Sequence, residues 1–473
     1  MELDKDLQAV QQARDLLRQA EQAQKTLAQM PQKTLDAIVQ NVAKVFCNAS
    51  AELAELAVQE TGFGNVSDKI KKNEFASRRV LSAIENMTCV GVLNENVREK
   101  LWEIGVPVGV IAAIVPSTNP TSTVCYKAMI ALKSGNSIVF SPHPKAIACT
   151  LKAAEIVAKA AETAGAPKGS VGCLSIPSMA GCKELMQAEQ TKLILATGGP
   201  AMVKAAYSSG KPAIGVGAGN GPVYIHHSAD IQKALSCVLQ SKTFDYGTVC
   251  ASEQSIIVEA PMEQKVKELA SKMGFYFMNK DEAGCLAKLL FKPNGTLNPE
   301  IVGKSALVLA EKAGFAVPNT TKVLVAREQE AGPTRPYSME KLCPVLAFFV
   351  MENEDAVLAK AIEVLIHEGS GHTFAMHAED RDVIRKFALQ IPVSRFLVNT
   401  PAALGGIGAT TGLFPALTLG CGAVGGSSSS NNISPMDLIN IRRVAWGTED
   451  VKKQPVDTDL IEMLTAKILE RLK

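Results

Sequence analysis

Short apolar runs alternate with amphipathic segments through the middle of the chain. The apolar runs predict buried β-strands, and the segments between them have the spacing of helices. The expected elements, in chain order, are 109–115, 121–134, 137–140, 146–164, 171–176, 179–188, 192–196 and a helix from about residue 200. Apolar strands that alternate with helices are typical of a parallel sheet covered on both faces. The pattern therefore predicts an α/β fold with a doubly wound, Rossmann-type sheet.

Further elements are expected on both sides of this region. Residues 5–29 and 33–60 carry apolar side chains at helical spacing. A second α/β region begins near Asp230, and its expected strands lie near 255–258, 322–325 and 345–349. A polar linker, 447–458, precedes a short terminal helix. We therefore expect two α/β regions with helices before and after them.

The composition argues against several classes of function. The 473 residues include 49 Lys and Arg against 47 Asp and Glu, a net charge of +2 without a basic block. Nucleic-acid binding and polybasic membrane docking are therefore not expected. The longest apolar stretch of the first half, 106–115, is well short of the roughly 20 residues that cross a bilayer. The charged, helical N-terminus lacks a signal-peptide core, so we expect a soluble cytoplasmic protein.

Glycines gather in two segments, with 7 of the 35 in residues 195–222 and 8 in residues 404–426. Glycine permits positive φ and close approach of the backbone to a ligand. In a doubly wound sheet, ligands bind beyond the carboxyl ends of the strands, which are here the loops at 116–120, 141–145 and 197–200. The last loop, Thr-Gly-Gly-Pro, offers free N–H groups and a helix start to a pyrophosphate. It lacks the Gly-x-Gly-x-x-Gly spacing, so a plain tight turn is the alternative.

Cys250 is the strongest candidate for chemistry among the 11 cysteines. No Cys-x-x-Cys pair occurs, which argues against a disulfide framework and a zinc knuckle, and most of the thiols are expected to be buried. Cys250 follows a glycine-containing turn and directly precedes a β-rich run. A cysteine at the end of an element can be presented to a substrate with a lowered thiol pKa. The alternative is a buried structural thiol.

Seven segments, taken in order, resemble the aldehyde dehydrogenase superfamily. They are most similar to its CoA-acylating branch, in particular the aldehyde dehydrogenase half of bifunctional aldehyde-alcohol dehydrogenases. The segments are Val-Pro-Ser-Thr-Asn-Pro at 115–120, Phe-Ser-Pro-His-Pro at 140–144, Leu-Ala-Thr-Gly-Gly-Pro at 195–200, Gly-Val-Gly-Ala-Gly-Asn at 215–220, Cys-Ala-Ser-Glu-Gln at 250–254, Glu-Lys-Leu-Cys-Pro at 340–344 and Gly-His-Thr at 371–373. The resemblance covers about residues 5–445. Bifunctional relatives continue into an iron-dependent alcohol dehydrogenase, so we expect that second activity to be absent.

The resemblance also implies how the chain is divided. An NAD-binding domain with the N-terminal helices would occupy residues 1–236, and an α/β catalytic domain would occupy residues 237–426. An oligomerisation arm would follow at 427–446. The linker and an amphipathic helix would complete the chain at 447–473.

Carried over residue by residue, the resemblance assigns Cys250 as the nucleophile that forms a thioester. The side-chain amide of Asn119 would stabilise the oxyanion together with the backbone N–H of Cys250. Asn119 is equally placed to cap the helix after Pro120, which is the alternative. Glu340 would bind the nicotinamide ribose, and His372 would accept the proton of the CoA thiol. The further cofactor contacts that the resemblance implies are Ser141, Pro142 and His143 around the adenosine ribose, Thr197, Gly198 and Gly199 at the pyrophosphate, and Gly217.

The segment 213–222 departs from the hydrolytic members of the superfamily. Those enzymes carry a Glu in a Glu-Leu-Gly-Gly-Lys context that activates water, whereas this segment contains no carboxylate. General-base catalysis contributes roughly 10²–10⁴-fold, so loss of the base favours a thiol acceptor over water. The implied reaction is aldehyde + CoA + NAD⁺ = acyl-CoA + NADH on acetaldehyde or propionaldehyde. Acylating sulfoacetaldehyde dehydrogenase, a water-using dehydrogenase and a non-catalytic nucleotide-binding scaffold are the alternatives.

The cofactor and metal expectations rest on local sequence. NAD is preferred only by analogy, because the segment 141–144 has no carboxylate to select a 2′-hydroxyl, and NADP stays open. His367, His372 and His377 recur every five residues, a spacing that does not place them on one helical face. We therefore expect no metal site.

The terminal helix is expected to interact with a partner. Its apolar stripe over residues 459–473 contains Leu460, Ile461, Leu464, Ile468 and Leu472. An isolated helix of about 15 residues is marginal and needs a groove. It resembles helices that recruit enzymes to bacterial microcompartment shells, and packing on its own oligomer is the alternative. Apart from the aldehyde and coenzyme A, the expected partners are further copies of this chain, a homodimer or higher oligomer.

Overall fold

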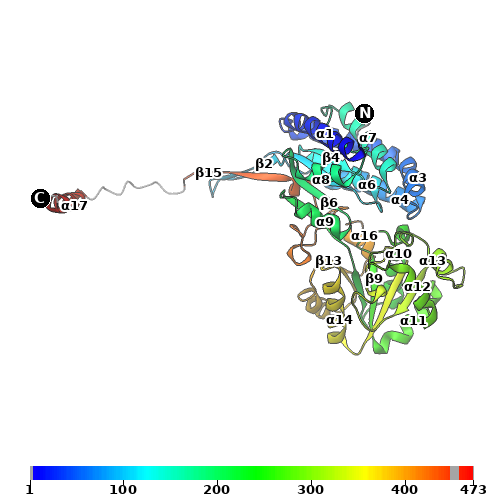
Figure 1. Ribbon diagram of the computed structural model, residues 1–473. Helices are drawn as coiled ribbons and strands as arrows, with labels where there is room; N and C mark the ends of the chain where they lie inside the picture. The colour runs from blue at the N-terminus through cyan, green and yellow to red at the C-terminus, as the bar shows by residue number, and fades with distance from the viewer. Residues whose placement is uncertain (1–3, 448–457, 472–473) are drawn as a thin grey trace.

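The computed structural model describes residues 4–447 and 458–471. They form two large parallel sheets with helices packed around them and a small antiparallel sheet that projects from the body (Figure 1). The α/β fold expected from the sequence is confirmed. In the described ranges, no helix has the length and apolar character needed to cross a membrane.

The first sheet has five parallel strands in the order β5-β4-β3-β6-β7. The strands are β3 (Val110–Ile114), β4 (Ser137–Ser141), β5 (Val171–Cys173), β6 (Thr191–Thr197) and β7 (Ala213–Val216). The helices around it are α1 (Lys5–Leu27), α2 (Gln32–Asn48), α3 (Ser50–Thr61), α6 (Pro120–Lys133), α7 (Ile147–Thr163), α8 (Met179–Gln187) and α9 (Pro200–Tyr207).

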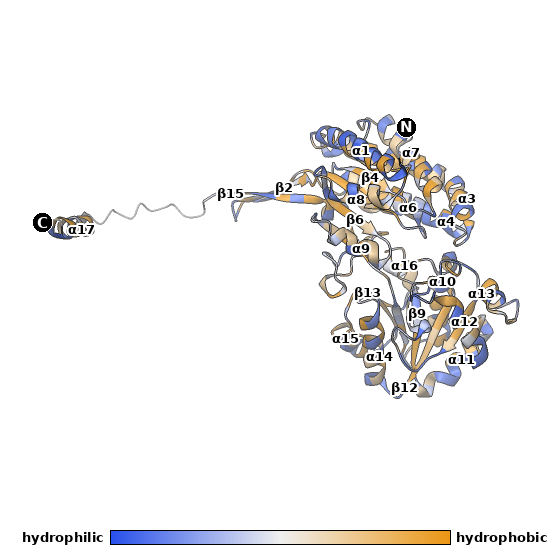
Figure 2. Ribbon diagram, viewed as in Figure 1, coloured by the Kyte–Doolittle hydropathy of each residue, from blue (hydrophilic) through white to orange (hydrophobic). Residues whose placement is uncertain are grey.

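Side chains of β3 show why these strands are apolar throughout. Ile111 and Ala113 belong to the core that includes α2, α6 and α7. Val110 and Ala112 belong to the core on the opposite face, with residues of α1 and α8. Because successive side chains of a strand point to opposite faces, both faces of the sheet are buried. Figure 2 shows the strands of the body as predominantly apolar, with polar residues on the outer sides of the helices.

The second sheet has seven parallel strands in the order β10-β11-β12-β9-β8-β13-β14. The strands are β8 (Gly221–Ile225), β9 (Glu253–Glu259), β10 (Phe275–Phe277), β11 (Val323–Arg327), β12 (Val345–Met351), β13 (Gly371–His377) and β14 (Val393–Val398). The helices around it are α10 (Ile231–Thr243), α11 (Glu263–Met273), α12 (Lys280–Leu290), α13 (Ala306–Ala313), α14 (Glu354–His367), α15 (Arg381–Ala388) and α16 (Ala402–Gly406).

A short helical segment connects the N-terminal helices to the body. It consists of α4 (Val66–Glu74), one turn of π-helix (Phe75–Arg79) and α5 (Val80–Ile84). The side chain of Asn65 begins α4 by accepting a hydrogen bond from the backbone N–H of Asp68 at 2.9 Å. Two lysines of this segment, Lys69 and Lys72, are buried.

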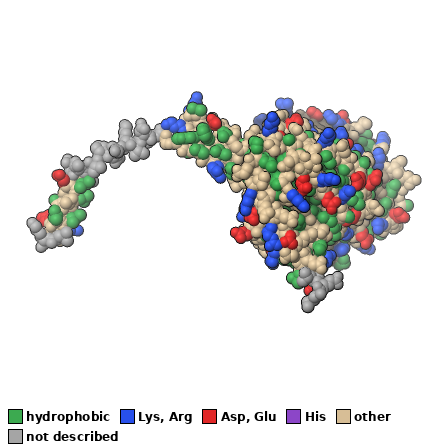
Figure 3. All heavy atoms as spheres, turned by 90° about the horizontal axis from the view of Figure 1, so that it is seen from above, with side chains coloured by type: hydrophobic (Ala, Val, Ile, Leu, Met, Phe, Trp, Pro, Cys, Tyr) green, Lys and Arg blue, Asp and Glu red, His purple; other side chains and the backbone are tan. Residues whose placement is uncertain are grey.

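The projecting sheet is an antiparallel arm of three strands in the order β1-β2-β15. Its strands are β1 (Gly91–Asn96), β2 (Leu101–Pro107) and β15 (Ile439–Ala445). Trp102 and Trp446 pack edge to face on it, with ring centroids 5.0 Å apart. Figure 3 shows the arm extending away from the body, with hydrophobic and basic side chains exposed. Strand β15 lies in the predicted arm, but the other two strands of the sheet, β2 beside it and β1, come from residues 91–107, which the apolar pattern did not identify.

Other expectations differ in detail from the structure. The single helix expected over 33–60 is two helices, α2 and α3, which meet at Ala49. The change from the first sheet to the second falls between β7 and β8, whereas the proposed domain boundary at 236 lies inside α10. The division into domains stays a prediction.

The expected terminal helix is present as α17 (Thr458–Arg471). All of its side chains from residue 461 to 471 are exposed, including Ile461, Leu464 and Ile468 of the predicted stripe. The side chain of Leu460, residue Leu472 and most of the linker lie outside the described residues. The described part of α17 therefore presents apolar side chains to solvent.

Candidate active site

Cys250 lies in a constrained loop between α10 and β9. A turn of 3-10 helix, Phe244–Gly247, leads from α10 to the cysteine. Asp245 and Tyr246 in this turn have positive φ values of 48° and 50°. Non-glycine residues keep this conformation only where the surroundings hold them. The position of Cys250 is therefore set by contacts outside its own strand.

One cavity of about 210 Å³ brings Cys250 together with Asn119 and Glu340. The loops after β3 and β6 form one wall, and the β7–β8 connection forms another. The site is thus built where the carboxyl edge of the first sheet meets the amino edge of the second. Three of the four predicted catalytic residues surround one space.

Asn119 precedes α6, but its side chain makes no capping hydrogen bond. The capping alternative is therefore wrong. Its Nδ2 donates to the carbonyl oxygen of Thr248 at 3.3 Å, and its Oδ1 accepts from Nζ of Lys72 at 2.6 Å. The amide consequently lies against the loop that carries Cys250, with its N–H groups on that side.

The thiol of Cys250 is not activated by its surroundings. Burial raises its pKa to about 12, and the carboxyl of Glu340 adds to the rise, while Arg395 acts in the opposite direction. The prediction of a lowered thiol pKa is therefore wrong. The physical reason is that loss of solvation disfavours the thiolate more than the neighbouring guanidinium favours it.

Glu340 is also neutral in this environment near pH 7. Burial raises the pKa of its carboxyl to about 8, and the nearby Glu368 contributes to the rise. Its Oε1 accepts a hydrogen bond from the backbone N–H of Gly219 at 2.9 Å. Glu340 therefore brings a polar carboxyl group, predominantly uncharged at neutral pH, to the wall of the cavity.

His372 lies behind the backbone of Cys250, outside the lining of the cavity. A β-carbon added to Gly219 would lie 2.0 Å from the carbonyl oxygen of Cys250 and 3.2 Å from Cε1 of His372. Glycine is therefore required between them. Nδ1 of His372 lies 2.9 Å from Oγ1 of Thr373, and burial lowers the pKa of the imidazole well below its usual value. His372 is a neutral imidazole, and its role as a base stays a prediction.

A second cavity, of about 490 Å³, contains the predicted adenosine and pyrophosphate contacts. Its lining includes the residues Ser141, Pro142, His143, Thr197, Gly198 and Gly199. The two glycines, Thr197 and His143 also line the cavity around Cys250, so the two spaces adjoin. A β-carbon on Gly199 would meet nothing within 4 Å, and Oγ1 of Thr197 is buried without a partner. Open backbone and an unpaired hydroxyl at strand ends fit a dinucleotide.

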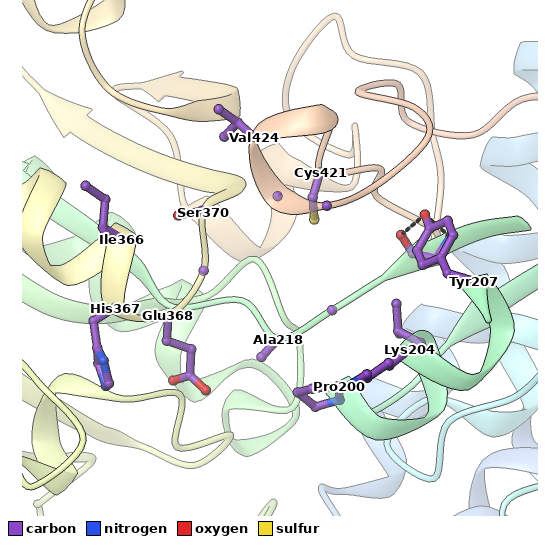
Figure 4. A pocket seen from close by; sticks show the side chains of 16 residues that line it. Pro200, Lys204, Tyr207, Ala218, Ile366, His367, Glu368, Ser370, Cys421 and Val424 are labelled. Atoms are coloured by element: carbon purple, nitrogen blue, oxygen red, sulfur yellow. Dashed lines mark hydrogen bonds between the residues drawn. The ribbon is translucent and has the colours of Figure 1, made fainter.

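A third cavity, of about 450 Å³, adjoins the same site from the other side of α9. Figure 4 shows it between Lys204 and Tyr207 of α9 and the segments that carry Glu368 and Cys421. Gly217 and Ala218 line both this cavity and the one around Cys250. The predicted cofactor residue Gly217 thus lies between two spaces that lead to the nucleophile.

Comparison with known proteins identifies the family of the chain. Residues 6–281 match the aldehyde dehydrogenase family. The chain belongs to this family. Its relatives lie in the CoA-acylating branch, as the seven sequence segments indicated.

Three relatives illustrate the range of similarity. A solved acetylating aldehyde dehydrogenase from Geobacillus thermoglucosidasius is 48% identical with a TM-score of 0.93, covering 95% of this chain and 100% of that one. The bifunctional aldehyde-alcohol dehydrogenase of Escherichia coli K12 is 43% identical over 92% of this chain. The match covers 49% of that relative, so the chain spans about half of its length. The propionaldehyde dehydrogenase of Rhodopseudomonas palustris, solved with bound CoA and an acylated cysteine, is 28% identical with a TM-score of 0.84, covering 92% of this chain and 97% of that one.

Within this aldehyde dehydrogenase, the segment without a carboxylate lies beside the nucleophile. Residues 213–222 comprise β7, the connection to β8 and the first residues of β8. Val216, Gly217 and Ala218 from this segment line the cavity around Cys250. The wall from which a carboxylate could reach a water molecule is therefore formed by backbone and small apolar side chains.

The three evenly spaced histidines do not come together. His367 ends α14, whereas His372 and His377 lie at the two ends of β13. Within the described residues, a group with ligand atoms close enough for a metal is His226, His227 and Glu354. It follows the carboxyl end of β8, at the opposite edge of the sheet from Cys250, and Nε2 of His226 lies 3.2 Å from Glu354.

Sequence reasoning missed the buried charges beside the site. Lys69 and Lys72 of α4 and Asp245 of the catalytic loop form ion pairs in which every side chain is at most 4% exposed. Two lysines three residues apart on a helix usually indicate a solvated face. A hint in the sequence is that Asp245 stands five residues before the nucleophile, in a segment otherwise poor in charge.

The raised thiol pKa predicts slow alkylation of Cys250 in the free enzyme. We expect the rate of reaction with iodoacetamide to rise about tenfold per pH unit from pH 7 to 10, because only the thiolate reacts. Glu340→Gln should raise the rate at pH 9, where the wild-type carboxylate is charged and opposes the thiolate. Peptide mass spectrometry measures both, with the exposed Cys285 as internal control. An alkylation rate of Cys250 that stops rising below pH 9 would contradict the raised thiol pKa.

Proposed function

We propose that the protein catalyses the CoA-acylating oxidation of a short-chain aldehyde, aldehyde + CoA + NAD⁺ = acyl-CoA + NADH + H⁺. The observation that carries the proposal is that the cavity with Cys250 and Asn119 adjoins the crevice at the strand ends and has one wall, from residues 213–222, without a carboxylate. Its relatives include an enzyme described as acetylating and one solved with bound CoA and an acylated cysteine. The bifunctional relatives are longer, so only the aldehyde dehydrogenase reaction is proposed.

The first half-reaction uses Cys250 as nucleophile. Its thiol proton passes to solvent water as the sulfur attacks the carbonyl carbon, and the π electrons of the C=O bond move to oxygen. Asn119 Nδ2 and the backbone N–H of Cys250 would donate to this oxyanion. The cofactor, when bound in the crevice, supplies the acceptor for the hydride that leaves the carbon. Ser141, Thr197 and the glycines at 198 and 199 would hold it, and a thioester on Cys250 remains.

The second half-reaction transfers the acyl group to coenzyme A. The CoA sulfur attacks the thioester carbon, Asn119 again donates to the oxyanion, and the sulfur of Cys250 leaves. A neutral His372 would accept the CoA thiol proton, although its path to the cavity passes the backbone at Gly219. Water is a poor competitor because residues 213–222 supply no base and Glu340 is mostly protonated at pH 7.

The cofactor preference is proposed as NAD, with NADP open. The segment from Ser141 to Pro144 brings no carboxylate to the crevice, and His143 lines it. A carboxylate there would favour the 2′-hydroxyl of NAD and reject the phosphate of NADP. The preference therefore rests on the family resemblance.

An uncharged aldehyde fits the site better than sulfoacetaldehyde. Within the described residues, the lining of the cavity around Cys250 contains no Lys and no Arg. The ammonium group of Lys72, which contacts Asn119, donates to three oxygen atoms of the protein. A sulfonate needs a cation with free donors. Acetaldehyde or propionaldehyde is therefore the proposed substrate.

The proposed reaction predicts that NADH formation depends on CoA. With acetaldehyde and NAD⁺ alone, we expect at most one NADH per active site, and continuous turnover should begin when CoA is added. Absorbance at 340 nm and product analysis measure this. Cys250→Ala should abolish turnover while nucleotide binding is retained. Formation of free acetate without CoA at a comparable rate would contradict the acylating assignment.

The cavity lining predicts the order of substrates. We expect kcat/KM for acetaldehyde and propionaldehyde to exceed that for sulfoacetaldehyde by at least about tenfold, because an unpaired buried sulfonate costs several kcal/mol. The kcat/KM for butyraldehyde shows whether the cavity accepts a longer aldehyde. Initial rates with each aldehyde at saturating CoA and NAD⁺ test the order. A preference for sulfoacetaldehyde would replace the proposed substrate.

Oligomerisation is proposed to involve the arm. Trp102, Ile441 and Trp446 are more than one-third exposed on it. Its outer strands, β1 and β15, each pair with β2 on one side only. Exposed strand edges with apolar side chains are typical sites for a second chain. We propose a homodimer or higher oligomer held through this arm.

The terminal helix is proposed to dock on a shell protein of a cytoplasmic bacterial microcompartment. Its exposed apolar side chains need a groove, and one relative is the propionaldehyde dehydrogenase of a fucose-utilisation microcompartment. A fluorescent reporter fused to residues 456–473 should concentrate in microcompartments when it is co-expressed with their shell proteins. Removal of these residues should leave the oligomer mass unchanged in light scattering. A diffuse reporter together with a smaller oligomer would show that α17 packs on its own oligomer instead.

A further inference from the structure

We infer that Lys72 is a positioning residue that orients the amide of Asn119 toward the oxyanion, and that Asp245 holds Lys72 in place. The inference rests on the proposed function, because it concerns the oxyanion of that reaction. Lys72 lies on α4, an element from which the family resemblance assigned no site residue.

Two lysines of α4 point into the protein. Lys69 is 3% exposed and Lys72 is 4% exposed, and their three-residue spacing places them on one face of the helix. Both contact Oδ2 of Asp245, which has no exposed surface. A buried ammonium is stable only when it is paired and hydrogen-bonded. These lysines are therefore fixed parts of the interior.

The ammonium group of Lys72 donates hydrogen bonds to three residues outside its own helix. Its Nζ donates to Oδ1 of Asn119 at 2.6 Å, to Oγ1 of Thr248 at 3.0 Å and to the carboxylate of Asp245. An ammonium has three donors, and these contacts account for all of them. The side chain thus connects α4, the β3–α6 connection and the loop before Cys250.

The contact with Lys72 fixes which end of the Asn119 amide faces the nucleophile. An ammonium can only donate, so the amide atom that faces it must be the oxygen. The nitrogen then donates to the carbonyl of Thr248 at 3.3 Å and to Oγ1 of Thr118 at 3.2 Å, and both contacts are long. Such a donor can turn to an oxyanion at little cost. Without Lys72, the amide can rotate and present its oxygen to the developing negative charge.

The charge of Lys72 also strengthens the donor. A cation at Oδ1 polarises the amide and makes its N–H groups better donors in a low-dielectric site. Burial lowers the pKa of Lys72 to about 8, which leaves the ammonium form predominant at pH 7. Burial alone would raise the pKa of Asp245, but Lys72 and Lys69 hold it below its usual value. The ion pair therefore persists at neutral pH.

Residues at the start of α4 in turn hold Asp245 in place. Its backbone N–H donates to Oδ2 of Asp68, and its Oδ1 accepts from the backbone N–H of Asn65, both at 2.9 Å. A β-carbon on Gly64 would lie 1.8 Å from this Oδ1, so the approach requires glycine. These contacts hold the positive φ of Asp245 and fix the carboxylate under Lys72.

A double-mutant cycle tests whether Lys72 acts through Asn119. Removal of one oxyanion donor typically lowers kcat by about 10²–10³-fold. We expect Asn119→Ala to show this loss and Lys72→Met to lose at least about tenfold in kcat, with KM for NAD⁺ within about twofold of wild type. The variant with both changes should be no slower than Asn119→Ala, because linked residues are not additive. Lys72→Arg should recover part of the activity.

Two measurements separate positioning from a loss of structure. Iodoacetamide alkylation of Cys250 develops no oxyanion, so its rate in Lys72→Met should match wild type, as should nucleotide binding. Lys152→Met, an exposed lysine on α7, is the matched control. If Lys72→Met does not fold, Lys72→Gln replaces it in the same cycle.

The outcomes distinguish this inference from the proposed function. Additive losses in the cycle, or a Lys72→Met kcat within about threefold of wild type, would overturn the positioning role of Lys72. Altered alkylation of Cys250 in that variant would assign Lys72 to the structure of the loop instead. Absence of CoA-dependent NADH formation in the wild type would count against the proposed function.

Discussion

The active site depends on a buried ion pair between a helix and the loop that precedes the nucleophile. Asp245 keeps an unfavourable positive φ because Lys69, Asn65 and Asp68 hold its carboxylate and its backbone. Removing one partner of such a pair typically costs about 3–5 kcal/mol, since the remaining charge is buried alone. Lys72, which pairs with the same carboxylate, reaches Asn119 at the edge of the first sheet. One buried cation therefore contacts both halves of the catalytic cavity.

Close backbone approach is the second constraint, and it gives the glycine clusters a physical role. Gly219 passes so near the carbonyl of Cys250 that a β-carbon would lie 2.0 Å from it. In the second cluster, a β-carbon on Gly406 would lie 2.7 Å from that of Ala251, the residue after the nucleophile. Gly371 is similarly blocked by the carbonyl of Cys421. At Gly219 and Gly406, separate segments thus pass too close to the loop of Cys250 for a side chain to fit between them.

The sequence predicts those features that depend on local pattern. Buried strands such as β3 and β4 are apolar on both faces, so their runs stand out, and the seven segments place Cys250, Asn119 and Glu340 together. The arm strand β1 was missed because its side chains are mainly exposed and it pairs only within the arm. The role of Lys72 was missed because Asp245, with which it pairs, is more than 170 residues away in the sequence. The thiol pKa of Cys250 was predicted in the wrong direction because desolvation depends on the packed site.

The protonated state of Cys250 constrains how the site can work. Because burial raises the pKa of this thiol to about 12, the thiol form predominates at pH 7. Glu340 cannot take the proton readily, because it is itself predominantly neutral at that pH. Arg395 is thus the charged group that favours the thiolate, whereas the buried cation of Lys72 acts on the substrate oxygen only through the amide of Asn119. Activation of the thiol must then accompany binding, since a bound ligand changes the solvation and charge around the sulfur.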